Sequence, residues 1–215
     1  MNREQLEGLL EKLNGEFKII KFIEGLPIVF LFDENHDNPN NSIESNIENA
    51  KSLIRNAFVK LIGVESLAGG KEWDEESEDF VKNDDNIKWY TKGLKDYKSR
   101  CTLFVDGLSS NCKAKIYGVE SIGMISKIET DVYDNCIDMS TDEQSVYIEN
   151  HHLHVERSKH FIRTISEEYN SRKLMGNIIL NCGLNHNNHI ENWVNDNTIK
   201  EITGCHFSYV RLNTI

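Results

Sequence analysis

Short apolar runs that alternate with stretches of helical periodicity restrict the fold of this chain more than any other feature. Six apolar runs have the length of strands: 26–32, 59–64, 101–105, 114–119, 175–182 and 206–212. Between them, apolar residues recur every three or four positions, as at Ile43, Ile47, Ala50 and Ile54, which is the spacing of one helix face. Such alternation is typical of βα units. The sequence therefore predicts an α/β fold with a mainly parallel central sheet flanked by helices.

Asn41 and Ser140 mark two expected helix starts, because each is followed three residues later by Glu and so resembles a capping box. The second is predicted to open one long helix that continues to about Tyr169. Helical stripes also predict a helix over 125–136 and a short one over 190–194.

Residues 66–100 break this rhythm and form a predicted insertion. Gly69 and Gly70 open the stretch, and acidic residues crowd positions 74–79. A long insertion at a strand end is often a lid or a binding loop. The alternative is a solvent-exposed acidic helical segment, which would have the same composition. No Pro- or Ser-rich linker divides the chain, so residues 1–215 are predicted to form a single domain.

The charge of the chain argues against two classes of partner. With a formal net charge of −11 at pH 7 and a pI near 5.2, the surface repels phosphate backbones and anionic lipid. The longest strongly apolar run, 28–32, is far too short to span a bilayer, and no signal-peptide core follows the N-terminus. Five cysteines without a CxxC pair predict buried free thiols in a reducing compartment. We therefore expect a cytoplasmic protein that binds neither nucleic acid nor membrane.

Acidic and histidine residues follow four of the predicted strands. Glu34 and His36 come directly after the first strand, and alternate residues of an extended chain share a face. Two identical GVES tetrads place Glu65 and Glu120 at the ends of two later strands, and His186 follows the late strand. Carboxyl ends of parallel strands share one edge of the sheet, where α/β proteins bind ligands. These five side chains are therefore predicted to converge, and neighbouring carboxylates would raise each other's pKa unless a cation or an Arg compensates.

The predicted long helix offers the compensating charge. Arg157 is in line with Leu153, Phe161 and Ile165, which are spaced by four, so it lies along the apolar stripe. An inward Arg can clamp a pair of carboxylates or stabilise an oxyanion. The neighbouring Glu156 leaves the alternative of a surface Glu–Arg pair, which would contribute little to stability.

Other patterns carry less weight. The Gly-Gly-Lys at 69–71 does not complete a phosphate-binding GxxxxGK[ST] loop, and the GVES serines lack the flanking glycines of a nucleophile elbow. His151, His152 and His154 could bind a metal, but their spacing on a helix is irregular, which favours a solvated polar patch. No cysteine has neighbours in the sequence that would activate a thiolate.

In their order along the chain, these residues resemble the Tiki-like hydrolase superfamily, which includes Tiki-type metalloproteases, TraB/GumN-like proteins, erythromycin esterases and ChaN-like haem-binding proteins. The matching positions are a Glu-x-His after the first strand (Glu34 and His36), glutamates closing later strands (Glu65 and Glu120), a helical Glu–Arg pair (Glu156 and Arg157) and a late Gly-x-x-His (Gly183 and His186). The resemblance spans residues 26–195. The sequence departs from the pattern at Asp33, where relatives usually have a small residue, and after His186, where relatives commonly have a glycine.

The resemblance implies an active site at the strand ends that hydrolyses an ester or amide bond of a small molecule or peptide. His36 and His186, together with Glu34 or Glu65, would ligate a divalent cation such as Mn²⁺ or Zn²⁺, or would poise a water molecule without one.

In this hypothesis Glu65 or Glu120 would be the general base, and Arg157 would stabilise the developing oxyanion. Two other classes of function stay open. One is a protein that binds haem or another small ligand through an axial histidine, His36 or His186. The other is an interaction protein that binds its partner through the acidic 72–85 stretch.

Overall fold

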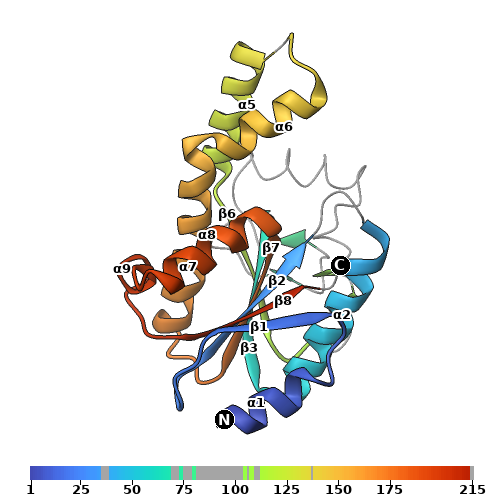
Figure 1. The fold of residues 1–215 in the computed structure, drawn as a ribbon, viewed down its shortest axis with the longest axis vertical. Coiled ribbons are helices and arrows are strands. Elements are labelled where there is room, and N and C mark those ends of the chain that lie inside the picture. Colours follow the sequence, from blue (N-terminus) through green and yellow to red (C-terminus); the bar gives the residue numbers. More distant parts are fainter. Residues whose placement is uncertain are drawn as a thin grey trace.

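The computed structural model of the chain describes residues 1–34, 39–68, 73–74, 79–80, 104–105, 107–108, 112–136 and 138–213. Within them, one sheet has six strands in the order β1-β8-β2-β7-β3-β6 (Figure 1). These strands are β1 (Glu16–Lys21), β2 (Ile28–Glu34), β3 (Val59–Ala68), β6 (Lys115–Glu120), β7 (Asn177–Gly183) and β8 (Ser208–Asn213). All neighbouring pairs are parallel except β1 with β8. The short strands β4 (Trp73–Asp74) and β5 (Asp79–Phe80) pair with each other. The predicted α/β fold with a mainly parallel sheet is confirmed.

Helices cover both faces of the sheet (Figure 1). They are α1 (Arg3–Leu10), α2 (Pro39–Asn56), α5 (Ile122–Cys136), α6 (Thr141–Asn150), α7 (His152–Ser171), α8 (Leu184–Asn195) and α9 (Ile199–Thr203). Leu6 of α1 and Leu53 of α2 belong to one core cluster with Phe30 and Phe32 of β2, whereas Phe161 of α7 belongs to a second cluster on the other face. Because side chains alternate along a strand, even-numbered β2 residues face α2 and odd-numbered ones face α7 and α8. The helices α5 and α6 extend beyond the carboxyl ends of the strands (Figure 1).

The long helix predicted after Ser140 is two helices. Ser140 caps α6 through the predicted capping box with Glu143, but the chain turns at His151, whose backbone is extended (φ −66°, ψ 133°). The His151 imidazole stabilises the turn, because Nδ1 accepts from the Leu153 N–H at 3.2 Å and Nε2 lies 2.8 Å from Asp131 Oδ2. Histidine is not among the usual capping residues, so the sequence pattern does not indicate this break.

One strand that was not predicted, one helix start and one predicted strand also differ from the sequence prediction. β1 has no long apolar run because it is an edge strand with much of its length exposed. α2 begins at Pro39, two residues before the expected cap at Asn41, since proline fits the first turn of a helix. In the predicted strand at 101–105, Phe104 and Val105 are helical. The rest of that run and most of the predicted insertion lie outside the described residues.

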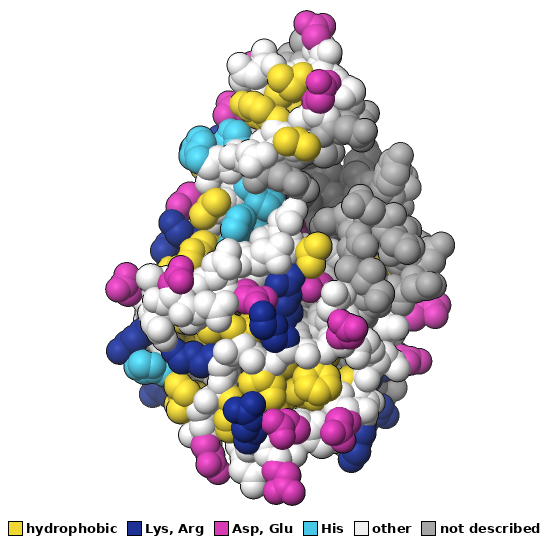
Figure 2. Space-filling model, viewed as in Figure 1, with side chains coloured by type: hydrophobic (Ala, Val, Ile, Leu, Met, Phe, Trp, Pro, Cys, Tyr) yellow, Lys and Arg dark blue, Asp and Glu magenta, His cyan; other side chains and the backbone are white. Residues whose placement is uncertain are grey.

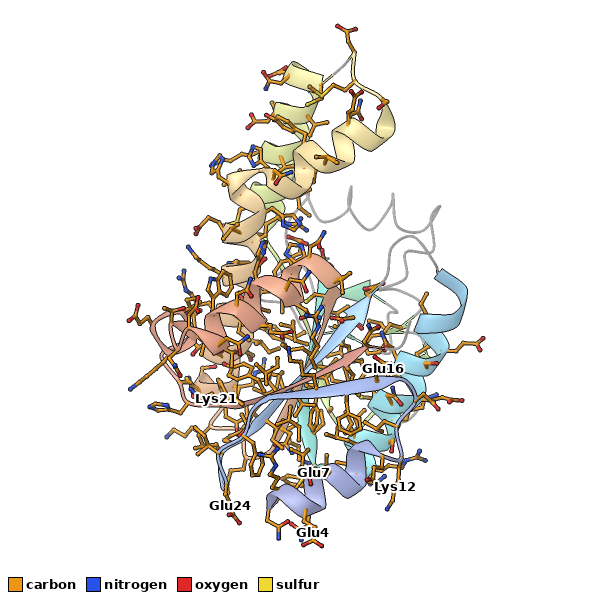
Figure 3. All side chains as sticks on the ribbon, in the orientation of Figure 1. Glu4, Glu7, Lys12, Glu16, Lys21 and Glu24 are labelled. Carbon is orange, nitrogen blue, oxygen red and sulfur yellow. The ribbon has the colours of Figure 1, made fainter. Side chains whose placement is uncertain are left out.

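Within the described part of the chain, no helix combines the length and the apolarity that crossing a membrane requires. Charged side chains of the N-terminal segment, such as Glu4 and Lys12, point away from the sheet into solvent (Figure 3). Cys182 is a buried free thiol, as predicted, and Cys205 is a half-buried one. Cys101 lies outside the described residues.

Gly63 lets α7 approach β3 closely, and adding a methyl group at this position tests that contact. A Cβ there would lie 2.7 Å from Ile165 Cδ1 and 3.0 Å from Val119 Cγ1, both in the buried core. We expect Gly63→Ala to lower the free energy of unfolding by about 1–3 kcal/mol, measured by urea denaturation, because core side chains must shift. The same change at Gly8, where nothing lies within 4 Å of the new atom, should raise it by about 0.5–1 kcal/mol. Equal effects at the two glycines would contradict the close packing.

Candidate functional site

An arginine–carboxylate cluster lies at the carboxyl ends of β3 and β6. Arg157 of α7 donates from Nε and Nη2 to the two oxygens of Glu120, at 3.1 and 2.8 Å, and from Nη2 to Glu65 Oε1 at 3.2 Å. The side chains of Arg157, Glu65 and Glu120 are 11%, 5% and 0% exposed. Burying charges to this extent is costly unless they compensate one another. The structure therefore places Arg157 inward, between the glutamates of the two GVES tetrads, which is one of the two alternatives that the sequence leaves open.

Glu65 is held in its ionised form by its surroundings. Besides its contact with Arg157, it accepts from the Gly183 N–H at 2.6 Å and lies 3.3 Å from His186 Nε2. Burial alone would raise the pKa of Glu65, but its interactions with His186, Arg157 and the Gly183 N–H together hold that pKa well below its usual range. A carboxylate with so low a pKa is a poor proton acceptor. Glu65 is thus better suited to orienting His186 than to acting as a general base.

Glu120 has a different environment from Glu65. Burial raises the pKa of Glu120, and its hydrogen bonds and charge interaction with Arg157 oppose this rise. Glu120 Oε1 also accepts from the Ser121 N–H at 3.0 Å. The Glu120 side chain has no solvent exposure and holds Arg157 through two hydrogen bonds.

Three histidines from two helices gather beside Glu65. His154 and Ser158 are one turn apart on α7, and His186 and His189 are one turn apart on α8, so each pair shares a helix face. The Ser158 hydroxyl connects the helices, because its Oγ lies 2.7 Å from His186 Nδ1 and 2.8 Å from His189 Nδ1. The rings of His154 and His186 are stacked, with their centroids 4.2 Å apart. Figure 2 shows histidine side chains (cyan) in the upper half of this face of the molecule. We call His154, His186 and His189 the histidine cluster.

The histidine cluster could hold a metal ion, because one ligand atom from each ring lies within 4.8 Å of the others. Burial, reinforced by neighbouring positive groups, lowers the pKa of His154 to about 3, and burial followed by His186 lowers that of His189. Both rings are therefore neutral at pH 7 and each has a lone pair. His154 Nδ1 is buried and has no hydrogen-bond partner among the described residues. Such an atom is costly to bury unless something ligates it.

Glu34, which is expected to converge with Glu65, lies on the other face of the sheet. Glu34 is two positions after Phe32 in β2, and side chains two positions apart point to the same face of a sheet. Glu34 therefore faces α2, as Phe32 does, and not α7. There its Oε2 accepts from Asn181 Nδ2 at 3.1 Å, and Asn46 of α2 lies 3.4 Å from the Asn181 amide oxygen. The sequence gives the alternation within each strand, but not which face of one strand matches which face of the next.

The predicted convergence is therefore seen for Glu65, Glu120, Arg157 and His186. Glu156, expected beside Arg157, is 47% exposed and pairs with Lys159 at 2.7 Å on the outer side of α7. Glu156 points outward because adjacent residues of a helix do not share a face. His36 lies outside the described residues.

Two members of the histidine cluster, His154 and His189, are not among the residues expected from the sequence. The interpretation of His151, His152 and His154 as a solvated patch is wrong for His151 and His154, which are buried. The HxxH spacing of His186 and His189 could have indicated a shared helix face. That conclusion needs α8 to begin at Leu184, whereas the apolar pattern predicts a helix only from 190 onwards.

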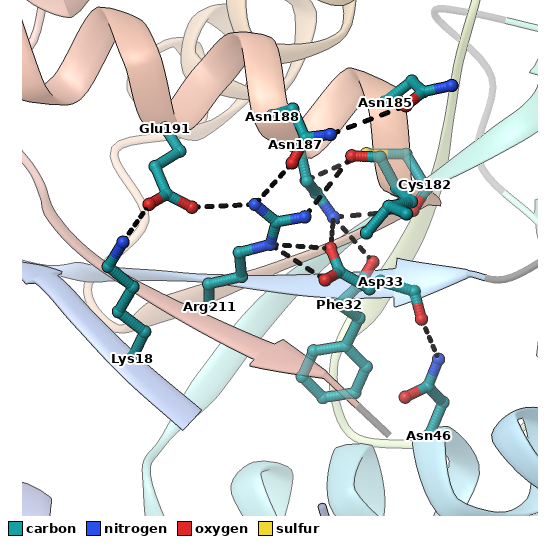
Figure 4. Close-up of polar contacts among 11 residues, drawn as sticks. Lys18, Phe32, Asp33, Asn46, Cys182, Asn185, Asn187, Asn188, Glu191 and Arg211 are labelled. Atoms are coloured by element: carbon teal, nitrogen blue, oxygen red, sulfur yellow. Dashed lines mark hydrogen bonds and ion pairs between the residues drawn. The ribbon is translucent and has the colours of Figure 1, made fainter. Parts of the chain in front are cut away.

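A second buried ion pair holds α8 against the sheet (Figure 4). Arg211 Nε donates to both carboxylate oxygens of Asp33, at 3.0 and 2.8 Å, and Nη1 donates to Glu191 Oε2 at 2.7 Å. Asn187 Nδ2 donates to Asp33 Oδ1 at 2.8 Å. These contacts connect β2 and β8 to α8. They therefore fix the helix that carries two of the three clustered histidines.

A groove of about 920 Å³ lies between α5, α6 and the start of α7. Met139, Val146 and Tyr147 line it together with His151 and His152. The first turn of α7 also carries His154, but the residues that line the groove do not include His154, His186 or His189.

No protein-family model, no curated protein and no solved structure matches the chain. The similarity to the Tiki-like superfamily therefore stays a prediction from the sequence.

Proposed function

We propose that this protein is a hydrolase that cleaves an ester or amide bond with the help of a divalent metal ion, Mn²⁺ or Zn²⁺, held by the histidine cluster. One observation carries the proposal: three imidazoles gather at the carboxyl edge of the sheet, and a buried carboxylate contacts one of them. Parallel α/β sheets bind ligands at this edge. Three protein ligands that leave an open position are typical of catalytic zinc sites.

The chain's own residues would define the surroundings of such an ion. When bound, the ion would lower the pKa of a water molecule enough for it to attack a carbonyl near neutral pH. Glu65 orients His186, while Arg157 and the Gly183 N–H hold Glu65 in place. His154 is neutral at pH 7, so it can bind an ion without first releasing a proton.

The surroundings also support a class of substrate. The groove beside α7 has apolar walls at Met139 and Val146, which suit an uncharged part of a small molecule or peptide. The net charge of −11 disfavours polyanionic substrates.

Removing one imidazole tests the proposal. The purified protein is assayed against a panel of esterase and peptidase substrates after chelation and again after addition of Zn²⁺ or Mn²⁺. We expect metal-dependent hydrolysis of at least one substrate, and a fall in kcat of at least about 10²-fold in His189→Ala. His160→Ala is the matched control on α7, where His160 contacts Thr164, and it should keep wild-type turnover. Equal turnover in His189→Ala and wild type, or no hydrolysis by the metal-loaded wild type, would overturn the proposal.

A further inference from the structure

We infer that the ion held by the histidine cluster is zinc, and that Glu65 is the positioning residue of this site, acting on the ion through His186. The inference rests on the proposed function for its chemical purpose. What it states, however, is an affinity of the histidine cluster for zinc, and this affinity can be measured without any reaction.

The donor atoms favour zinc over manganese. All three members of the cluster offer imidazole nitrogens, which suit zinc, whereas manganese prefers carboxylate and carbonyl oxygens. Glu65 is the carboxylate that contacts the cluster, but Arg157, Gly183 and His186 already occupy its oxygens. In the part of the chain that is described, the set of candidate ligands is therefore purely nitrogen. A site of three imidazoles with an open fourth position matches the coordination of catalytic zinc.

The positions of the nitrogens are close to those that zinc requires. Tetrahedral Zn–N bonds of about 2.0–2.1 Å place the ligand atoms roughly 3.3 Å apart, and here they lie within 4.8 Å of one another. Ser158 Oγ lies 2.7 and 2.8 Å from Nδ1 of His186 and His189, so this hydroxyl has to turn away from any Nδ1 that binds the ion. His154 and His186 have ring planes only 17° apart, so we expect these rings to rotate out of the stack when the ion binds.

Glu65 determines which nitrogen of His186 can bind the ion. An ionised carboxylate can only accept a hydrogen bond, so the contact of 3.3 Å places an imidazole hydrogen on Nε2. The nitrogen that can bind zinc is then Nδ1, once it gives up its contact with Ser158 Oγ. Carboxylates in this position fix the tautomer of a metal-binding histidine, and removing them weakens metal affinity by about 10–100-fold. Arg157 and the Gly183 N–H hold the other side of Glu65. The buried arginine–carboxylate cluster thus holds the Glu65 carboxylate in its position against His186.

Zinc affinity of the full chain, measured by competition with a chromophoric chelator, tests this inference. We expect the wild type to bind a single zinc ion, and Co²⁺ in its place to show the visible absorption bands of a four-coordinate ion. Glu65→Gln should weaken zinc binding by about 10–100-fold, and His154→Ala should weaken it further because a ligand is lost. His160→Ala and Glu156→Gln, which alter α7 outside the cluster, should bind zinc like the wild type.

Several results would overturn the inference. A wild-type protein that binds no zinc would leave the histidines as a polar contact between α7 and α8, and unchanged affinity in Glu65→Gln would remove its positioning role. If Glu65→Gln does not fold, the imidazole nitrogen chemical shifts of the wild type decide instead: zinc on Nδ1 of His186 supports the role of Glu65, and zinc on Nε2 overturns it. Tight zinc binding without hydrolysis would refute the proposed function alone. Hydrolysis by a wild-type protein that binds no zinc would refute both the zinc site and the metal dependence of the proposed function, and would leave only the hydrolase activity.

Discussion

Arg157→Ala is expected to lower the free energy of unfolding by about 3–5 kcal/mol. The substitution removes the cation that Glu65 and Glu120 share, and both carboxylates are buried at the strand ends. Each would then be left in a poorly solvated position close to another negative charge, which is far more costly than losing an exposed ion pair. Urea denaturation of the purified variants, followed by circular dichroism, measures the loss.

Two further variants test whether the buried carboxylates cause this loss of stability. Arg163→Ala alters an exposed arginine of α7 whose Nε lies 3.5 Å from the Ile202 carbonyl, and it should change stability by no more than about 0.5 kcal/mol. Adding Glu120→Gln to Arg157→Ala should restore part of the lost stability, because one uncompensated charge disappears. A loss below about 1 kcal/mol in Arg157→Ala would show that the two carboxylates are solvated and do not depend on the arginine.

Arg211→Ala should cost about 3 kcal/mol at pH 7, because Asp33 is only 1% exposed and would keep the Asn187 amide as its side-chain partner. Burial already raises the pKa of Asp33, while the hydrogen bonds and charge of Arg211 oppose that rise. Without Arg211 the pKa of Asp33 should rise further. The folded variant would then bind more protons than the unfolded chain, so its stability falls as the pH rises.

The pH dependence of this deficit distinguishes a charge effect from a packing effect. As the pH falls from 7 towards 4, Asp33 becomes protonated in the folded variant, and the deficit relative to wild type should shrink. Urea denaturation at several pH values measures it, with Arg55→Ala on the exposed side of α2 as the control. A deficit that is the same at pH 4 and pH 7 would mean that lost packing, and not an unpaired carboxylate, accounts for the effect.

The central strands could be predicted because both faces of the sheet are covered. Strands buried on both faces are nearly continuous apolar runs, as in the stretch from Ile28 to Phe32, whose residues are all buried. β1 was not predicted, because an edge strand needs no such apolar run. The inward position of Arg157 was one of two alternatives, and its spacing of four from Phe161, which is fully buried, is the feature that favoured it.

The histidine cluster could not be predicted in the same way. The position of His154 depends on the break at His151, which is stabilised by Asp131 from another helix. The position of His189 depends on where α8 begins, and that helix is held by Asp33 and Arg211 from two strands. Periodicity describes one segment at a time, whereas these contacts join segments that are distant in the sequence.

The strand order has a consequence for how the polypeptide is made. β2 has β7 and β8 as its neighbours, so Val29 pairs with Ile178 on one side and Tyr209 on the other. A nascent chain that has left the ribosome only as far as α7 thus has an apolar strand with no partner. Closing such long loops slows folding, and the unpaired edge favours aggregation in the meantime. We therefore expect the central part of the sheet to form late, after synthesis has passed β7 and β8.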